Sequence, residues 1–313
     1  MDINSFYASV ISPFLRKTTL GERIDMAFIA FHANLQFAEF LYANSGSKIY
    51  SDSELENIFT DLDIESLNIL KRFMHRQYAC PHSSLMVHPK YFYTDEEKQE
   101  QQKLLKDYNK TIKKFHLPRH LIGPESIYYH HGLRFAPHFI KDNIKGKNFA
   151  DIGGWLGDST LIFTEYNPNR IVIFEPEQKN RINLQKVMAK NRISNKLYEL
   201  QPFALSNESG IFNNFECKTL DELSQNYQIP FGVLKADIEG MGLRFLLGAK
   251  ETIKRDRPLL TLSIYHNEDE FIGIYKTLKE WNLNYIFEIK SFQPMGSHGE
   301  ISLLAYPEEW KNK

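Results

Sequence analysis

Residues 145–180 read KGKNFADIGGWLGDSTLIFTEYNPNRIVIFEPEQKN, and this stretch decides the predicted fold. A short apolar run, 149–152, leads into the glycine-rich turn GGWLG (153–157). The next residues, 158–160, are of the types that cap a helix, and a second apolar strand then ends at Glu175. Strand, glycine turn, helix, strand and acidic residue are typical of a nucleotide-binding βαβ unit.

The spacing around the turn indicates which ligand this unit binds. A dinucleotide site needs G-x-G-x-x-G, so that a pyrophosphate can sit on the helix N-terminus. Here the order is D-x-G-G-x-x-G-D-S, with Asp151 before the glycines and Asp158 after them. Two carboxylates would repel a pyrophosphate but suit a cationic ligand that carries an amino acid. S-adenosylmethionine fits, and Glu175 is placed to accept hydrogen bonds from its two ribose hydroxyls.

The backbone of the turn supplies further contacts in this prediction. Gly153 and Gly157 allow a tight turn and a close approach of the backbone to the ligand. Gly154, Trp155 and Ser159 are also predicted to bind the cofactor, because amides at the helix N-terminus would face the ligand.

Composition narrows the class of protein. The 313 residues suggest one large or two modest domains, and 38 basic against 39 acidic residues give no electrostatic case for nucleic acid. Cys80 and Cys217 match no metal or disulfide spacing, which favours a reducing cytoplasm. The most apolar stretch, 24–43, is too polar to span a bilayer, and no signal peptide is evident. The histidines of the N-terminal half show no metal-ligand spacing, so no metal site is predicted.

The chain divides near residue 120. Residues 1–120 are predicted to form a mainly helical domain, and residues 121–313 the S-adenosylmethionine-binding domain. The helical part could be a substrate lid, a homodimerisation arm or a partner-docking site. The segment YYHHGL (128–133) precedes the first strand, and it either lines the cofactor pocket or simply packs.

Further strands are predicted in the C-terminal part. They span 197–203, 211–215, 231–236, 259–264, 285–290 and 301–306. The last two have no helix between them and must pair antiparallel. Asp237 and Glu239 follow the strand 231–236, where ligands bind in open parallel sheets. Burying carboxylates without partners is costly, so chemistry accounts for this pair better than structure does.

From about residue 125 to its end, the sequence resembles the FkbM family of S-adenosylmethionine-dependent methyltransferases. The segments that carry the resemblance are DIGGWLGDST (151–160), FEPEQKN (174–180), ALSNESG (204–210), TLDEL (219–223) and LKADIEGMGLRFLLGAKETI (234–253). The resemblance implies an α/β, class I methyltransferase (Rossmann-like) fold, with a seven-stranded, mostly parallel sheet and helices on both faces. The implied strand order is 3-2-1-4-5-7-6 with strand 7 antiparallel. The implied activity is O-methylation, most often of a sugar in a glycan, lipopolysaccharide or small molecule.

The same resemblance assigns roles to residues. Asp151, Gly153 and Gly157 would hold the methionine end of the cofactor, and Glu175 the ribose. Ser206 would lie near the adenine, as its place after the third strand also suggests, and Asp237 would lie by the methyl-transfer centre.

The general base is a separate question, because the family often has other residues where this chain has Met241-Gly242 and Tyr265-His266. His266 ends the fifth strand and has the appropriate chemistry. Asp237 could instead orient that histidine, act as the base itself, or bind a metal ion with Glu239, although two carboxylates do not make a metal site.

Two other classes of function compete with methyl transfer. An NAD-dependent oxidoreductase could use a similar sheet, but the G-x-G-x-x-G fingerprint is missing. A catalytically silent scaffold in a glycan-assembly complex would keep the cofactor residues and use the N-terminal helices as its interface.

Overall fold

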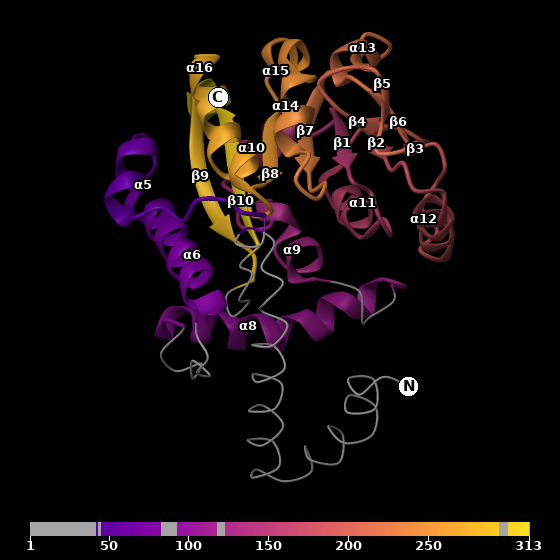
Figure 1. Ribbon diagram of the computed structural model, residues 1–313. Coiled ribbons are helices and arrows are strands. Elements are labelled where there is room, and N and C mark those ends of the chain that lie inside the picture. The colour runs from indigo at the N-terminus through magenta and orange to yellow at the C-terminus, as the bar shows by residue number, and fades with distance from the viewer. Residues whose placement is uncertain (1–41, 43–44, 83–92, 118–122, 294–299, 313) are drawn as a thin grey trace.

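The computed structural model describes residues 42, 45–82, 93–117, 123–293 and 300–312. Its centre is a seven-stranded sheet in the order β3-β2-β1-β7-β8-β10-β9 (Figure 1). β10 is antiparallel to both neighbours, and the other adjacent pairs are parallel. The strands are β1 (Asn148–Ile152), β2 (Arg170–Phe174), β3 (Tyr198–Gln201), β7 (Phe231–Ala236), β8 (Leu259–Ser263), β9 (Tyr285–Ser291) and β10 (Ile301–Pro307). The predicted class I methyltransferase topology is confirmed.

Helices cover both faces of the sheet because successive strand residues point to opposite sides. In β1, Phe149 packs with one buried cluster, whereas Ala150 and Ile152 pack with another. The first cluster is covered by α10 (His138–Ile144), α11 (Asp158–Phe163) and α12 (Gln178–Lys190). The second is covered by α13 (Leu220–Ser224), α14 (Gly242–Leu247), α15 (Lys250–Asp256) and α16 (Ile274–Glu280).

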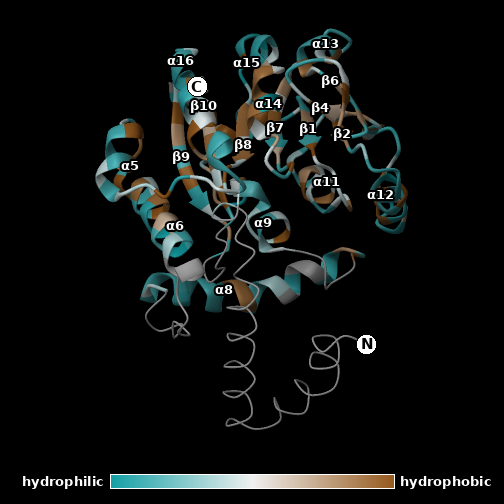
Figure 2. Cartoon of the chain, in the orientation of Figure 1, coloured by the Kyte–Doolittle hydropathy of each residue, from teal (hydrophilic) through white to brown (hydrophobic). Residues whose placement is uncertain are grey.

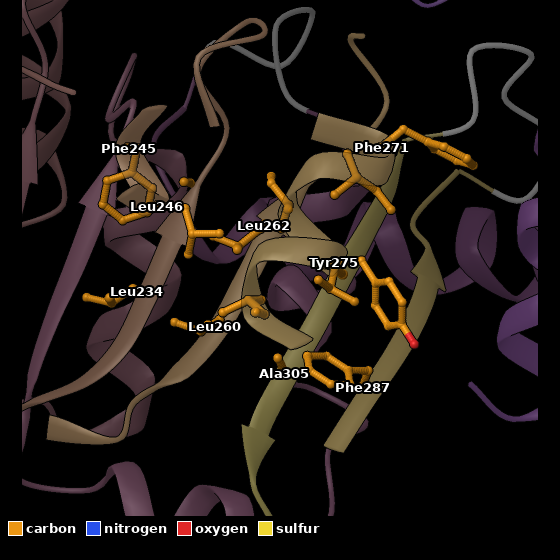
Figure 3. Packing of buried hydrophobic residues seen from close by; sticks show 14 of the residues in the cluster. Leu234, Phe245, Leu246, Leu260, Leu262, Phe271, Tyr275, Phe287 and Ala305 are labelled. Carbon is orange, nitrogen blue, oxygen red and sulfur yellow. The ribbon is translucent and has the colours of Figure 1, made fainter. Parts of the chain in front are cut away.

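The second cluster is the larger one. Figure 3 shows Leu260 and Leu262 of β8 beneath the helical segments that carry Leu246 and Tyr275. In Figure 2, β8 is brown, whereas α12, which has water on its outer side, is mostly teal. The burial pattern therefore follows the hydrophobic pattern of the sequence.

The N-terminal helices α5 (Asp52–Ile58) and α6 (Ile64–His82) pack at the β9 edge of the sheet (Figure 1). The Ser66 hydroxyl of α6 accepts a hydrogen bond of 2.9 Å from the Ile289 amide of β9. Phe59 and Phe73 contact Phe271, which belongs to the same cluster as the sheet. A helix thus covers the edge strand, which protects its unpaired backbone groups.

Two helices lie beyond the carboxyl ends of the parallel strands. They are α8 (Asp95–Thr111) and α9 (Pro124–Ile127), and Figure 1 shows them below the sheet, on the side to which the β9 arrow points. Short helical turns complete the fold: η3 (Ile112–Lys114), η5 (His130–Gly132), η6 (Thr164–Tyr166), η7 (Asp269–Gly273) and η8 (Glu308–Asn312).

The prediction of a single added strand over residues 211–215 is wrong, because two strands occur there. The structure has a small three-stranded sheet instead, in which β6 (Phe215–Lys218) pairs with β4 (Ala204–Leu205) and β5 (Gly210–Phe212). Asn213 and Asn214 form the two-residue turn between β5 and β6, with φ of 46° and 66°. Asparagine tolerates this left-handed conformation, which the tight turn of a hairpin requires.

Candidate functional site

A cavity of about 590 Å³ opens at the carboxyl ends of β1, β2 and β7. Its lining includes the glycine turn after β1, Glu175 after β2, the β4–β6 sheet, Asp237 after β7 and Glu125 of α9. Predicted site residues that line it are Gly153, Trp155, Asp158, Ser159, Glu175 and Asp237. The other predicted residues, Asp151, Gly154, Gly157, Ser206 and His266, lie behind this lining.

The glycine turn is tied to the neighbouring strands by its backbone. The amides of Gly153 and Gly154 donate to the Phe174 carbonyl at 3.0 and 3.2 Å. Gly153 has a φ of +83°, and a Cβ on it would lie 2.2 Å from the Asp237 carbonyl oxygen. Only glycine therefore fits at this position, because the chain after β7 passes against it.

The start of α11 differs from the prediction. Gly157, with a φ of +81°, is the N-cap, and the side chains of residues 158–160 do not cap the helix. A Cβ on Gly157 would come within 2.7 Å of Met188 on α12. The three polar side chains are buried instead and bind to other parts of the site.

Asp151 lies beneath the turn and is fully buried. Its Oδ1 is 3.1 Å from Lys235 Nζ, and its Oδ2 accepts a 2.7 Å hydrogen bond from Thr160. Lys235 also donates to the Gly153 carbonyl at 3.0 Å. Lys235 neutralises Asp151, and together they hold the turn in place. Contrary to the prediction from the sequence, Asp151 therefore has no free charge with which to attract a cationic ligand.

Glu175 faces the cavity with both oxygens held by backbone amides. Oε2 accepts from the Trp155 amide and Oε1 from the Glu177 amide, each at 2.9 Å. A carboxylate oxygen can accept more than one hydrogen bond, so Glu175 keeps capacity for a ligand hydroxyl. Trp155 itself has 40% of its surface exposed at this end of the cavity.

Beyond Glu175 the cavity becomes apolar. Ala204, Leu205, Phe212, Phe215 and Cys217 of the small sheet line it. This surface suits a flat aromatic group.

Ser206 lies next to this apolar surface but does not reach the cavity. It is buried, and its hydroxyl accepts from Arg244 Nε at 3.2 Å. Its neighbours Ala204 and Leu205 line the cavity, whereas Ser206 does not.

Ser159 and Asp158 contact the segment that precedes β1. Ser159 Oγ lies 2.8 Å from His131 Nε2, and His131 lines the cavity, whereas Tyr129 packs with Phe292. Both alternatives for the segment YYHHGL therefore occur, at different residues. Burial raises the pKa of Asp158 above its usual range, and a hydrogen bond from Ser126 opposes this.

His266 lies behind Asp237 rather than on the cavity surface. Its Nδ1 is 2.6 Å from Glu270 Oε2, and its Nε2 is 3.5 Å from Asp237 Oδ1. Burial alone would lower the pKa of His266, but the hydrogen bond and charge of Glu270 and the charge of Asp237 raise it above the ordinary value. The ring is thus held between Glu270 and Asp237 and is not a free base.

Four titratable residues that line the cavity were not among the predicted site residues: Lys235, Tyr265, Glu125 and Glu300. Lys235 and Tyr265 lie within two residues of predicted ones, and the Tyr265 hydroxyl donates to Asp237 Oδ1 at 3.4 Å. Glu125 and Glu300 come from opposite ends of the domain, and their carboxyl groups lie within hydrogen-bonding reach of each other. Neither glutamate belongs to a motif or a periodic stretch, so the sequence alone does not indicate that they belong to the site. We call the group Glu125, Asp158, Asp237 and Glu300 the acidic end of the cavity.

Two further observations bear on function. Within the described residues, no three or more His, Cys, Asp or Glu side chains gather in a way that could bind a metal ion. The helices of these same residues include none with the length and apolar character to cross a membrane.

Comparison with known proteins agrees with the fold. Residues 146–293 match the model of the methyltransferase FkbM domain. Among curated proteins, no significant match to the chain is found. The solved structure of methyltransferase FkbM from Methylobacillus flagellatus KT superposes with a TM-score of 0.57 at 18% identity, over 80% of this chain and 58% of that one. The chain thus spans less than two thirds of that protein, and the likeness at this identity shows the fold.

Two further solved structures superpose with lower TM-scores. An O-methyltransferase from Bacillus cereus, in complex with S-adenosylhomocysteine, has a TM-score of 0.43 and 13% identity, over 77% of this chain and 100% of that one. The O-methyltransferase TomG from Streptomyces achromogenes, in complex with S-adenosylmethionine, has a TM-score of 0.42 and 14% identity, over 68% of this chain and 90% of that one. Neither score is high enough to carry an argument. The family match and the sheet order together identify residues 146–293 as a domain of the FkbM methyltransferase family.

Proposed function

We propose that the protein transfers a methyl group from S-adenosylmethionine to a hydroxyl of a sugar, glycan or carbohydrate-containing small molecule. The observation that carries the proposal is one continuous cavity, in which an apolar surface and Glu175 lie at one end and Asp237 at the other. The adenosine of the cofactor would occupy the first end, and the acceptor would meet the sulfonium methyl at the second.

The residues that line the cavity have different roles in this proposal. Glu175 accepts hydrogen bonds from the ribose, and the turn at Gly153 and Trp155 holds the methionine part. Asp237 lies at the methyl-transfer centre, where Tyr265 and His266 fix its carboxylate. Transfer is an in-line displacement, so the alignment of acceptor oxygen, methyl carbon and sulfur supplies much of the rate.

The charge of the cavity supports an acceptor without phosphate. Of the described residues that line it, six are aspartate or glutamate residues, at least three of which are free of the Glu125–Glu300 pair and of Asp158, and the one lysine, Lys235, is paired with Asp151. An anionic acceptor, such as a nucleotide-linked or phosphorylated sugar, would be repelled. A neutral sugar would find hydrogen-bond acceptors for its hydroxyl groups.

The proposal also covers the cellular compartment of the protein and its oligomeric state. Cys217 is a free thiol, which fits the cytoplasm we propose. We also propose residues 1–120 as a unit separate in role from the cofactor domain, with homodimer formation as one role. Light scattering on the full chain and on a chain lacking residues 1–41 would test dimer formation, and equal monomer masses for both would refute it.

Calorimetric titration of S-adenosylmethionine and S-adenosylhomocysteine tests the cofactor assignment. We expect Glu175→Ala to weaken binding of both at least about tenfold, because ribose hydrogen bonds to a charged group are lost. Glu177→Ala is the matched control, since Glu177 is an exposed acid two residues away that does not line the cavity. It should bind like the wild type. Binding of neither ligand to the wild type would refute methyl transfer and favour the silent-scaffold alternative.

Radiolabelled S-adenosylmethionine then tests the acceptor class. We expect methyl transfer to members of a panel of neutral methyl glycosides and none to the same sugars carrying a phosphate. Transfer to the phosphorylated sugars alone would refute the charge argument while leaving the methyltransferase assignment intact.

A further inference from the structure

Glu125 and Glu300 are brought together from distant parts of the chain. Glu125 is the second residue of α9, and Glu300 directly precedes β10. Both line the cavity, and both lie outside the matched domain 146–293. No role in cofactor binding explains two carboxyl groups placed against each other in this position.

The chemistry of the two side chains favours a proton between them. Ionised carboxylates only accept hydrogen bonds, so a hydrogen bond between these two carboxyl groups needs a proton on one of them. Among the described residues, no hydrogen-bond partner reaches Glu125 Oε2, which is buried. This oxygen is therefore an unoccupied acceptor on a cavity wall.

The surroundings keep the proton in place. Tyr108 of α8, Asp158 of α11, Asp237 after β7 and Tyr265 after β8 carry the titratable groups that face the pair. The two tyrosines are neutral near pH 7, whereas the negative charges of Asp158 and Asp237 disfavour ionisation of the pair. Burial, with the charges of Asp158 and Asp237, raises the pKa of Glu125 to about 7, and burial with the charge of Glu125 raises that of Glu300 well above its usual range.

We propose that the Glu125–Glu300 pair is the proton acceptor of the methyl-transfer reaction, an inference that rests on the proposed function. The acceptor hydroxyl oxygen forms a bond to the methyl carbon as the bond from that carbon to sulfur breaks. The electron pair of the broken bond stays on sulfur, which gives neutral S-adenosylhomocysteine. The hydroxyl proton moves to the singly protonated pair, which becomes doubly protonated and later returns the proton to solvent.

The other candidates for the base fit less well. His266 does not line the cavity, and its Nδ1 is bound to Glu270. Asp237 is engaged by Tyr265 and His266, so it is suited to orient the hydroxyl. A base is most effective when its pKa lies near the working pH, as is the case for Glu125 of the carboxyl pair.

Infrared difference spectroscopy on the full-length protein tests the shared proton without an acceptor. Between pH 5 and pH 9 we expect the wild type to show a protonated carboxyl signal that titrates near pH 7 and is lost or shifted in both Glu125→Gln and Glu300→Gln. Glutamine keeps the size of the side chain and can donate to the remaining carboxylate. Glu239→Gln is the control, because Glu239 lines the same cavity but is exposed. A pair fully ionised at pH 7, or a signal that neither substitution moves, would overturn the proposal.

Methyl transfer to the neutral glycoside panel tests the catalytic role. We expect both glutamine variants to bind S-adenosylmethionine within about twofold of the wild type and to lose about 10²- to 10⁴-fold in kcat. The rising limb of kcat against pH should move in both variants and stay in place in Glu177→Gln, because the Glu177 side chain is exposed and does not line the cavity. Unchanged rates and an unchanged limb would overturn the base role while the enzyme remains active. A panel with no product would instead refute the sugar acceptor, and the infrared experiment would then decide on the pair.

Discussion

Replacing Gly153 by alanine tests how tightly the glycine turn is closed against the chain after β7. The new Cβ would lie 2.2 Å from the Asp237 carbonyl oxygen and 2.9 Å from Ile238 Cγ2. Gly146 offers a matched control, because its φ of +74° is close to the +83° of Gly153 but nothing lies within 4 Å of its Cβ position. Both substitutions place alanine in the left-handed region, and only one adds a collision.

The magnitude follows from this comparison. Left-handed backbone costs an ordinary residue about 1–2 kcal/mol, which is the expected loss for Gly146→Ala. In Gly153→Ala, the chain after β7 must also move by about 1 Å, and overpacking of this kind costs about 1–3 kcal/mol more. We therefore expect a total loss of about 2–5 kcal/mol in the free energy of unfolding.

Urea denaturation of the two variants measures the difference, and calorimetry adds a functional readout. Gly153→Ala should weaken S-adenosylmethionine binding more than about tenfold, because the turn lines the cavity. Gly146→Ala, at the far end of β1, should leave binding unchanged. If the two variants lost the same stability within about 0.5 kcal/mol, the turn would have room to relax and the reasoning would be refuted.

Three further predictions concern stability. Lys235→Met should cost about 3–5 kcal/mol in urea denaturation by leaving Asp151 buried without its partner, and adding Asp151→Asn should restore most of it. Because the pKa of Glu125 rises from 4.5 to about 7 on folding, the folded state binds this proton more tightly. Up to about 3 kcal/mol of the free energy of unfolding is therefore lost as pH rises between these values. Thermal melts at pH 5 and pH 8 should show a smaller loss of stability in Glu125→Gln than in the wild type. Ser66→Ala should cost about 1–3 kcal/mol in the same urea assay by leaving the Ile289 amide unpaired, and no loss would contradict that role.

The fold could be predicted because its signals are local. The stretch 145–180 contains the turn and both flanking strands, and the resemblance supplied the strand order. The hairpin between β5 and β6 was missed because its turn is Asn213-Asn214, without the glycine that usually marks such turns. The N-cap of α11 was missed because a left-handed Gly157 competes with three polar residues that are normally better caps.

The site was predictable only where its residues follow the strands of the motif. Glu175 and Asp237 line the cavity because each directly follows a strand of the parallel sheet. His266 lies three residues after β8, and the sequence does not show that Glu270, one helical turn later, binds its ring. Glu125 and Glu300 meet only through the tertiary structure, so no spacing in the sequence could bring them together.

The part of the cavity outside the matched domain is held firmly to the sheet. His130 and His131 both have left-handed φ angles, of 52° and 50°, and both are buried. His131 Nε2 lies 2.8 Å from Ser159, and its carbonyl accepts from Thr261 Oγ1 at 3.0 Å, so contacts to α11 and β8 hold the strained segment in place. Glu125, five residues before His130, is thereby fixed relative to the glycine turn before any ligand binds. A base that must meet a hydroxyl in line with the methyl gains most from such fixed placement, because misalignment by about 1 Å can cost about 100-fold in rate.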